Sequence, residues 1–293
     1  MGQKKRGFFC LTGWTGTVLL LLVSLTGQGL AQTENPAAKA VKSSPQMMPY
    51  VLHQSFPRNA GEGRPEQLFF DELARALFKD AGLSFSEQDQ QPWKRAYQET
   101  LYGPRHVIYP TTRTTDREND LKWAGPISRT FWNLYGRKDA GWNDQKLADI
   151  FALARIGVAM GSAREDYLRK RGAKNIVSVP RDDQLFAMLQ AERIDVVAMG
   201  AASVDFFSND PENQGIELGR LASYRVCYLY FALSKDSANG DVAKLQNSLE
   251  AFYQDGRFLA MRRDFDLSAD PDSEFIQALA DPKNRDIGCV DIE

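Results

Sequence analysis

The chain has 293 residues, 36 of them basic and 38 acidic, which gives a net charge of −2. Three of the basic residues and none of the acidic ones lie in the first 31 positions, which leaves 33 against 38 and a net charge near −5. No basic stripe carries interleaved aromatic residues, so the composition excludes a nucleic-acid-binding protein. The roughly 245 residues beyond the N-terminal region are too many for one small core and fit two lobes.

The N-terminal region has the layout of a bacterial secretory signal peptide. Lys4, Lys5 and Arg6 form a basic start, an apolar segment at 8–27 follows, and small residues lead to Ala31. This order predicts cleavage after Ala31 and export to the periplasm. The alternative is an uncleaved anchor, because the apolar segment approaches the length of a membrane span. Threonines and glycines dilute its first half, which favours cleavage.

Residues 32–46 are rich in Ala, Lys, Pro, Ser and Asn, which predicts a disordered leader. Beyond the signal segment only Cys227 and Cys289 remain, and an even pair in an oxidising compartment is consistent with one disulfide. A buried free thiol at Cys227 with a separate tail thiol is equally compatible with the pattern. The two histidines, His53 and His106, show no metal-ligand spacing, so we expect neither a metal site nor a cofactor.

Helix and strand patterns alternate along the rest of the chain. This rhythm predicts an α/β fold with two lobes, each a mainly parallel sheet flanked by helices. Lobe 1 is expected at 47–135 plus 225–293, lobe 2 is inserted at 136–224, and a two-strand hinge crosses near 134–142 and 218–224. Strands are expected at 49–53, 83–85, 106–110, 155–160, 175–179, 194–199 and 224–234, and helices at 67–81, 91–102, 146–151, 164–171, 182–191, 202–207, 241–254 and 257–265.

The stretch 109–127 is the most informative part of the sequence. A short strand leads into a turn in which Thr112 and Thr114 precede Arg117. A guanidinium can hold a carboxylate with two parallel hydrogen bonds while hydroxyls and backbone N–H groups take the remaining lone pairs. The pattern therefore favours a carboxylate site. The competing interpretation is an exposed Arg117–Glu118 ion pair beside an ordinary turn, which contributes only about 0–1 kcal/mol.

Three segments together resemble the extracellular solute-binding proteins of family 3, the amino-acid-binding type of receptor for ABC importers. They are Q-P-W-K-R-A at 91–96, T-x-T-x-x-R-E followed by W-x-G-P-I within 112–127, and R-I-G-V at 155–158 leading to Gly161 and Ser162. The similarity runs over about 47–265. It implies two lobes that close around a small carboxylate or amino-acid-like ligand, a partnership with the membrane subunits of an ABC importer, and a monomer.

The resemblance also assigns ligand-binding residues. Thr112 and Thr114 would hydrogen-bond the ligand carboxylate, and Arg117 would pair with it. Gly161 and Ser162 would open a helix toward the ligand, with Ser162 able to serve as the N-cap as well.

Two further candidates complete the set. In the amino-acid receptors an acidic residue after the strand equivalent to 194–199 holds the α-amino group, but here Gly200 follows that strand and no acid occurs before Asp205. The resemblance therefore implies carboxylate recognition without implying α-amino recognition, and Gly200 stands at the position in question. Phe56 would either line the cleft or lie in the core.

The remaining residues of these segments have structural interpretations. We expect Trp93 to pack between helix and sheet, Trp123 to support the turn from the core, and Arg113 to face solvent. The sequence contains no G-x-S-x-G, H-E-x-x-H or P-loop motif, so we expect no enzyme. Two alternatives stay open, namely a periplasmic dehydratase-like enzyme on the same fold and an accessory protein that binds an exported partner enzyme.

Overall fold

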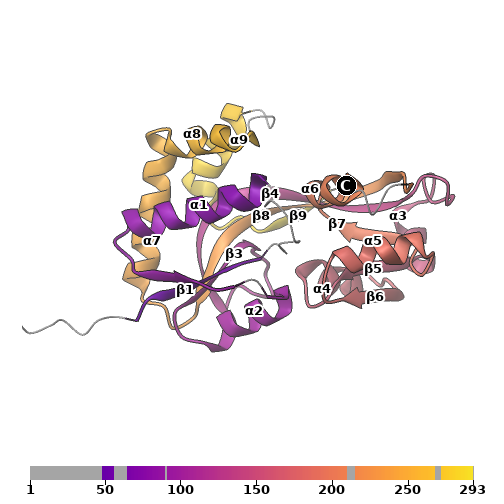
Figure 1. Ribbon diagram of the computed structural model, residues 1–293, viewed down its shortest axis with the longest axis horizontal. Helices are drawn as coiled ribbons and strands as arrows, with labels where there is room; N and C mark the ends of the chain where they lie inside the picture. The colour runs from indigo at the N-terminus through magenta and orange to yellow at the C-terminus, as the bar shows by residue number, and fades with distance from the viewer. Residues whose placement is uncertain (1–47, 56–64, 90, 210–214, 268–271, 293) are drawn as a thin grey trace, which may run out of the picture. The chain divides into compact units, whose positions relative to one another are not determined.

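The structure is a computed structural model that describes residues 48–55, 65–89, 91–209, 215–267 and 272–292 (Figure 1). Residues 47–293 form one compact unit. The expected signal peptide, the leader and Phe56 lie outside the described residues. Within the described ranges, none of the helices is long and apolar enough to cross a membrane.

The helices and strands follow the alternation expected from the sequence. The helices are α1 (Pro65–Asp80), α2 (Trp93–Tyr102), α3 (Leu147–Leu153), α4 (Ala163–Lys170), α5 (Asp183–Gln190), α6 (Ala201–Ser208), α7 (Asn239–Gln254), α8 (Arg257–Asp264) and α9 (Asp272–Ala280), followed by the short 3-10 helix η3 (Pro282–Asn284). The strands are β1 (Tyr50–Gln54), β2 (Phe85–Glu87), β3 (His106–Thr112), β4 (Leu121–Arg137), β5 (Arg155–Ala159), β6 (Asn175–Val179), β7 (Val196–Met199), β8 (Leu218–Ser234) and β9 (Cys289–Asp291).

Helix α1 shows how local sequence sets these bounds. It begins at Pro65, a residue suited to the first turn because the missing N–H has no helical partner there. Phe69, Leu73 and Leu77 recur every four residues and are fully buried on one face. Burial of each such side chain stabilises the fold by about 1.5–3 kcal/mol. The helix ends just before Gly82, whose φ of 65° is the left-handed conformation that favours glycine.

The nine strands in the described part of the chain belong to one sheet, in the order β2-β1-β3-β8-β4-β7-β5-β6, with β9 paired to β8. The outer pairs β1–β2, β1–β3, β5–β6 and β5–β7 are parallel, as expected from the βα rhythm. The centre of the sheet is antiparallel, because β8 pairs with β3 and β4, and β4 pairs with β7. The outer strands of each lobe are therefore parallel as expected, and the antiparallel pairs all involve β4 or β8, the two strands that cross between the lobes.

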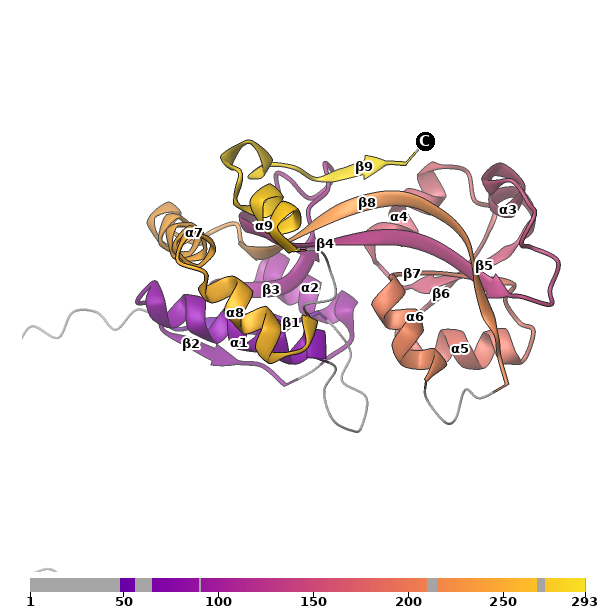
Figure 2. The same cartoon turned by 90° about the horizontal axis from the view of Figure 1, so that it is seen from above.

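Strands β4 and β8 are the longest elements, with 17 residues each, and pair from Leu121↔Ser234 to Arg137↔Leu218. They run side by side from the group of β1–β3, α1, α2 and α7–α9 to the group of β5–β7 and α3–α6 (Figure 2). We call the first group lobe 1 and the second lobe 2. The sequence pattern missed β4 as a strand and placed the start of β8 six residues late, at 224.

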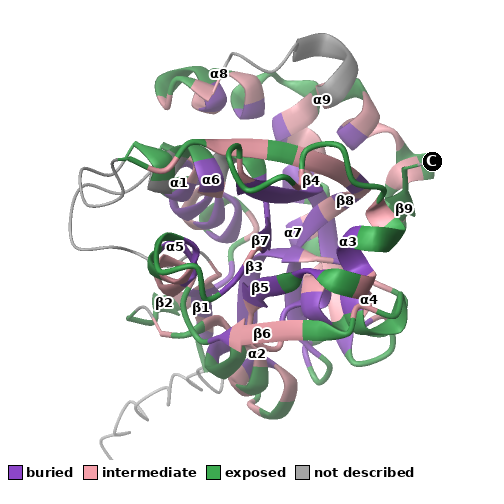
Figure 3. Ribbon diagram, turned by 90° about the vertical axis from the view of Figure 1, so that its right-hand side faces the viewer, coloured by how far each residue is buried: buried purple, intermediate pink, exposed green. Residues whose placement is uncertain are grey.

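Each lobe has apolar side chains on both faces of the sheet. In lobe 1, Val107 and Tyr109 of β3 belong to the core under α1, α7, α8 and α9, whereas Ile108 between them belongs to the core under α2. In lobe 2, Val196 of β7 faces α3 and α4, and Val197 faces α5 and α6. This alternation is the two-residue period of a strand covered on both faces. Burial is accordingly concentrated along the strands (Figure 3).

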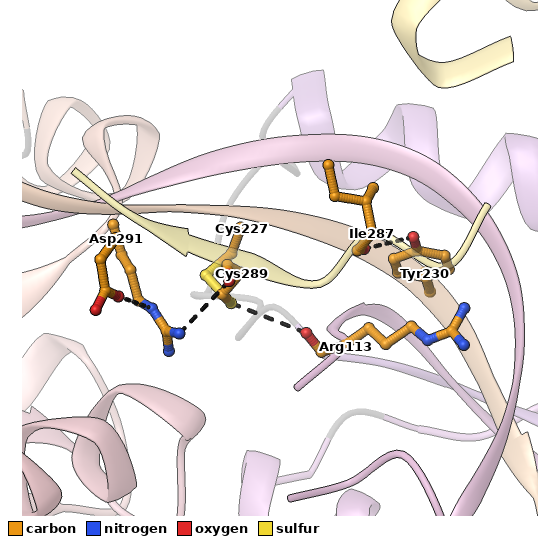
Figure 4. Close-up of a disulfide and its surroundings, with 7 residues drawn as sticks. Arg113, Cys227, Tyr230, Ile287, Cys289 and Asp291 are labelled. Carbon is orange, nitrogen blue, oxygen red and sulfur yellow. Dashed lines mark hydrogen bonds and ion pairs between the residues drawn. A yellow bond between two sulfur atoms is a disulfide. The ribbon is translucent and has the colours of Figure 1, made fainter. Parts of the chain in front are cut away.

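The C-terminal segment, to which the sequence pattern assigned no structure, pairs with β8. Strand β9 pairs antiparallel with β8, and Cys227 and Cys289 stand opposite each other in this register. The two residues are joined by a disulfide with a Cα–Cα distance of 4.0 Å (Figure 4). Cys227 is fully buried, as the apolar strand suggested. The tail is thereby fixed to the strand that links the lobes.

Candidate functional site

The turn after β3 places Arg117 inside the protein. Thr112 is the last residue of β3, and the N–H of Arg117 donates to the carbonyl oxygen of Thr114 at 3.0 Å. This turn directs the Arg117 side chain inward, so that only 5% of the residue is exposed. Thr112 and Thr114, which precede Arg117 in the same segment, are half-buried.

The Arg117 guanidinium lies over two aromatic rings of α2. Its central carbon is 4.7 Å from the centroid of the Trp93 ring and 4.6 Å from that of Tyr97. The rings are four residues apart on one helical face and stack at 4.7 Å. Such cation–π contacts hold a guanidinium in place without neutralising its charge. The sequence analysis had assigned Trp93 to packing and did not single out Tyr97.

Arg117 has no carboxylate within ion-pair distance among the described residues. Among the described residues, the one hydrogen bond of its side chain runs from Nη2 to the carbonyl oxygen of Gly161 at 3.4 Å, a long contact that joins lobe 1 to lobe 2. Burial lowers the pKa of Arg117, and the Tyr97 hydroxyl and the more distant Asp166 and Asp116 oppose that shift. A buried cation with so little compensation is costly unless an anion joins it.

The Arg117–Glu118 surface pair of the competing interpretation does not form, because Glu118 binds Arg113 instead. The expectation that Arg113 faces solvent is wrong, since only 8% of this residue is exposed. Its guanidinium contacts Asp286 at 2.9 Å and donates to the carbonyl oxygen of Arg285, also at 2.9 Å. Its central carbon is also 5.7 Å from the centroid of the Trp123 ring and 5.3 Å from that of Tyr230. Strand alternation failed here because the C-terminal tail covers Arg113.

Gly161 and Ser162 precede α4 and form a variant of the capping box, in which the Glu165 carboxylate binds the N–H of the residue before the N-cap. The Ser162 hydroxyl accepts a hydrogen bond from the N–H of Glu165 at 3.2 Å, and the Glu165 carboxylate accepts one from the N–H of Gly161 at 2.6 Å. The N–H of Ser162 donates to the carbonyl oxygen of Ala159. Ser162 is therefore an N-cap, as allowed for above, and both N–H groups expected to face a ligand donate within the chain.

Gly200 follows β7 and lies beside two polar side chains. A Cβ atom added at Gly200 would stand 3.3 Å from the Thr130 hydroxyl and 3.5 Å from Nη2 of Arg164. Asp205, the first acid after this strand, is exposed on α6. A cation therefore stands at the position where the sequence comparison had looked for an acid. Neither Thr130 nor Arg164 had been singled out, because only the tertiary structure brings them to Gly200.

The two histidines come together although they are 53 positions apart. His53 Nε2 and His106 Nδ1 are 2.7 Å apart, Gln91 hydrogen-bonds His53 Nδ1 at 3.2 Å, and the same Gln91 amide donates to Glu99 at 2.7 Å. His53, Glu99 and His106 form a cluster with the donor types of a metal site, all within 4.8 Å of one another. His53 Nε2 and His106 Nδ1 are hydrogen-bonded to each other, and Glu99 Oε2 accepts from Gln91. A metal bound by these three atoms would have to displace the His53–His106 hydrogen bond.

Comparison with known proteins gives a likeness of structure and none of sequence. No protein-family model matches the chain, and no curated protein matches it. The arginine-, lysine-, histidine-binding protein ArtJ from Geobacillus stearothermophilus matches with a TM-score of 0.65 at 16% identity, over 78% of this chain and 100% of that one. A histidine kinase sensor domain with similarity to periplasmic binding proteins matches with a TM-score of 0.64 at 17% identity, over 74% and 95%.

The chain has the fold of the periplasmic binding proteins. The GluR0 ligand-binding core from Nostoc punctiforme, solved with L-glutamate, gives a further match with a TM-score of 0.61 at 16% identity, over 76% of this chain and 100% of that one. The two-lobed fold expected from the sequence is thus confirmed, and so, at the level of the fold, is the resemblance to the family 3 solute-binding proteins. In this periplasmic-binding-protein fold, Arg117 and Gly161 meet between the two lobes.

Proposed function

We propose that this protein binds a small carboxylate-bearing solute between its lobes and presents it to the membrane subunits of an ABC importer. The observation that carries the proposal is Arg117, a buried guanidinium that has no carboxylate partner among the described residues and contacts Gly161 of the other lobe. A ligand carboxylate would supply the missing charge and accept bidentate hydrogen bonds from it. Thr112 and Thr114 lie close by in the chain to add hydroxyl donors.

The structural comparisons support a solute-binding function rather than catalysis. ArtJ is described as an arginine-, lysine-, histidine-binding protein, and the GluR0 core holds L-glutamate. A further match is a substrate-binding protein of an amino acid ABC transporter, bound to L-arginine. For this chain we propose the same kind of function, with hinge bending at β4 and β8 and lobe boundaries at 135/136 and 224/225. We further propose export to the periplasm, cleavage after Ala31, a monomer and no enzymatic activity.

A thermal-shift screen tests the proposal. The protein is purified from the periplasmic fraction, stripped of bound solute by unfolding and refolding, and mixed with amino acids, hydroxy and keto acids, dicarboxylates and aromatic acids. A ligand at about 100 times its dissociation constant adds about 2.7 kcal/mol to the free energy of unfolding, which corresponds to a shift of several degrees. We expect a carboxylate to give this shift. A flat panel would contradict the proposal.

The two alternatives give different results in the same preparation. Turnover of a cyclohexadienyl acid such as prephenate would identify a dehydratase-like enzyme. Co-purification with an exported enzyme, unaffected by any solute in the panel, would identify an accessory protein. Both outcomes would replace the receptor function while leaving the fold unchanged.

A further inference from the structure

A second arginine at the start of α4 also lacks a counter-ion. The Nε atom of Arg164 is buried without a hydrogen-bond partner, and no carboxylate in the described part of the chain lies within ion-pair distance of its guanidinium. The guanidinium is 5.6 Å from the centroid of the Trp132 ring, and one of its terminal nitrogens lies against Gly200. The hydroxyl of Tyr224, the next ring in this group, is likewise buried without a partner.

Two other arginines with little exposure of their side chains pair with carboxylates. Arg105 contacts Asp241 at 3.3 Å, and Arg113 contacts both Glu118 and Asp286. Because a buried charge is costly without a partner, such pairing is the normal arrangement. Arg117 and Arg164 depart from it, although Arg164 is half-buried as a residue. Arg117 contacts Gly161, and Arg164 is the second residue of the helix that follows, so both arginines are associated with the start of α4.

A further basic residue lies beside the start of α4. The side chain of Lys94 lies against Gly161, so that a Cβ atom there would stand 3.2 Å from its Cγ. The acid closest in the chain to Arg164, Glu165, is already engaged, since it accepts hydrogen bonds from Gly161, Arg169 and Ser178. Burial lowers the pKa of Arg164, and Tyr224 and Asp182 oppose that shift.

We propose that the ligand carries two anionic groups, one bound by Arg117 and the other by Arg164, and that it is a small dicarboxylate. This inference rests on the proposed solute-binding function. An α-ammonium group placed near Gly200 would meet the Arg164 guanidinium, and two like charges in a site of low dielectric repel each other. A second carboxylate there would instead give the guanidinium the acceptors that the protein does not provide. An ordinary monocarboxylic amino acid is the ligand class that this arrangement disfavours.

Isothermal titration of the periplasmic protein with matched acids tests the inference. The probes are the dicarboxylates with three to six carbons and, for each, the monocarboxylate of equal length. We expect the best dicarboxylate to bind about 10–100-fold more tightly than its matched monocarboxylate, since a hydrogen bond to a charged group contributes about 1.5–3 kcal/mol. In Arg164→Gln this ratio should fall to near one, while monocarboxylate binding persists. In Arg117→Gln both probes should bind more weakly.

The outcomes separate this inference from the function on which it rests. Equal binding of the two probes by the native protein, or an unchanged ratio in Arg164→Gln, would overturn the dicarboxylate assignment and leave a monocarboxylate receptor. The absence of binding by any acid would overturn the solute-binding function itself. Far-ultraviolet circular dichroism and the melting temperature show whether Arg164→Gln is folded. If that variant unfolds, Arg164→Lys, which keeps the charge and loses the bidentate geometry, should show a reduced ratio and otherwise contradicts the inference.

Discussion

Glu118 binds Arg113 through two parallel contacts, from Nε to Oε2 at 2.8 Å and from Nη2 to Oε1 at 2.6 Å. Its neighbour in the sequence, Arg117, is left without an acidic partner among the described residues. The two arginines stand four positions apart in one turn and have opposite electrostatic situations. Arg113 is neutralised and holds the C-terminal tail, whereas Arg117 keeps an uncompensated charge beside Gly161. This division of charge underlies the functional proposal.

The pair Arg113 and Arg117 gives a matched prediction for stability. In the absence of ligand, Arg117→Gln should leave the free energy of unfolding unchanged or raise it, because the substitution removes a buried charge without a carboxylate partner. Arg113→Gln should lower it by about 1–3 kcal/mol, because Glu118 loses its bidentate partner and the tail loses its anchor. Urea denaturation of the ligand-stripped variants measures both. Equal destabilisation by the two substitutions would show that Arg117 is an ordinary structural residue.

Alanine substitutions at Gly161 and Gly141 distinguish the effect of backbone strain on ligand binding from that of a steric contact at the site. Both have left-handed φ values, 70° and 74°, so alanine at each should cost about 1 kcal/mol. A Cβ at Gly161 meets the Lys94 side chain, whereas nothing lies within 4 Å of one at Gly141. We therefore expect Gly161→Ala to weaken ligand binding and Gly141→Ala to leave it unchanged, as measured by titration calorimetry. Equal affinities in the two variants would remove Gly161 from the site.

The disulfide should make a large contribution to stability. Cys227 and Cys289 are 62 positions apart, and closing a loop of this length stabilises the folded state by about 4 kcal/mol in the chain-entropy model. The Cys227→Ser, Cys289→Ser variant should therefore unfold at a clearly lower urea concentration than the oxidised protein. Addition of a reductant should lower the midpoint of the native protein and leave that of the variant unchanged. A native protein insensitive to reductant would contradict a bonded pair.

His53 should make the stability depend on pH. Burial lowers the pKa of His53 to about 4, the charge of His106 adds to this shift, and Glu99 opposes it. The unfolded chain titrates near pH 6.5 and takes up the proton first. The contribution of neutral His53 is therefore fully present above about pH 6.5 and is lost as the pH falls toward about 4.

Urea midpoints measured between about pH 7 and pH 4.5 test this dependence. The native protein should lose more stability over this range than His53→Gln, in which the titrating group is absent. Parallel curves for the two proteins would show that another group is responsible for the pH dependence.

The sequence predicted the elements with strong periodicity. Strand β6 was placed at its observed bounds, whereas the assignment of Arg117, Thr112 and Thr114 to a carboxylate site stays a prediction. Strand β4 was missed because its Gly125, Pro126 and polar residues break the apolar alternation that marks a strand. Its strand conformation depends on pairing with β8, which only the folded chain provides.

The contacts at the candidate site were missed for the same reason, namely that they depend on tertiary structure. Tyr97 and Trp93 face Arg117 because helical spacing stacks their rings, but nothing local links α2 to the turn after β3. Arg164 and Gly200 lie 36 positions apart and meet only in the tertiary structure. The tail contacts of Arg113 involve residues more than 170 positions away. Spacing in the sequence carries no information on such contacts, so the composition of the site could not be completed from it.

Titration calorimetry of the best carboxylate from the screen with the native protein, Arg117→Gln and the surface control Arg181→Gln tests the central claim most directly. Loss of one partner of a buried charge pair costs about 2–5 kcal/mol. We therefore predict that Arg117→Gln binds the acid at least about 30-fold more weakly and that Arg181→Gln binds it as tightly as the native protein. An Arg117→Gln protein that retains native affinity would contradict the claim that this buried arginine binds the carboxylate.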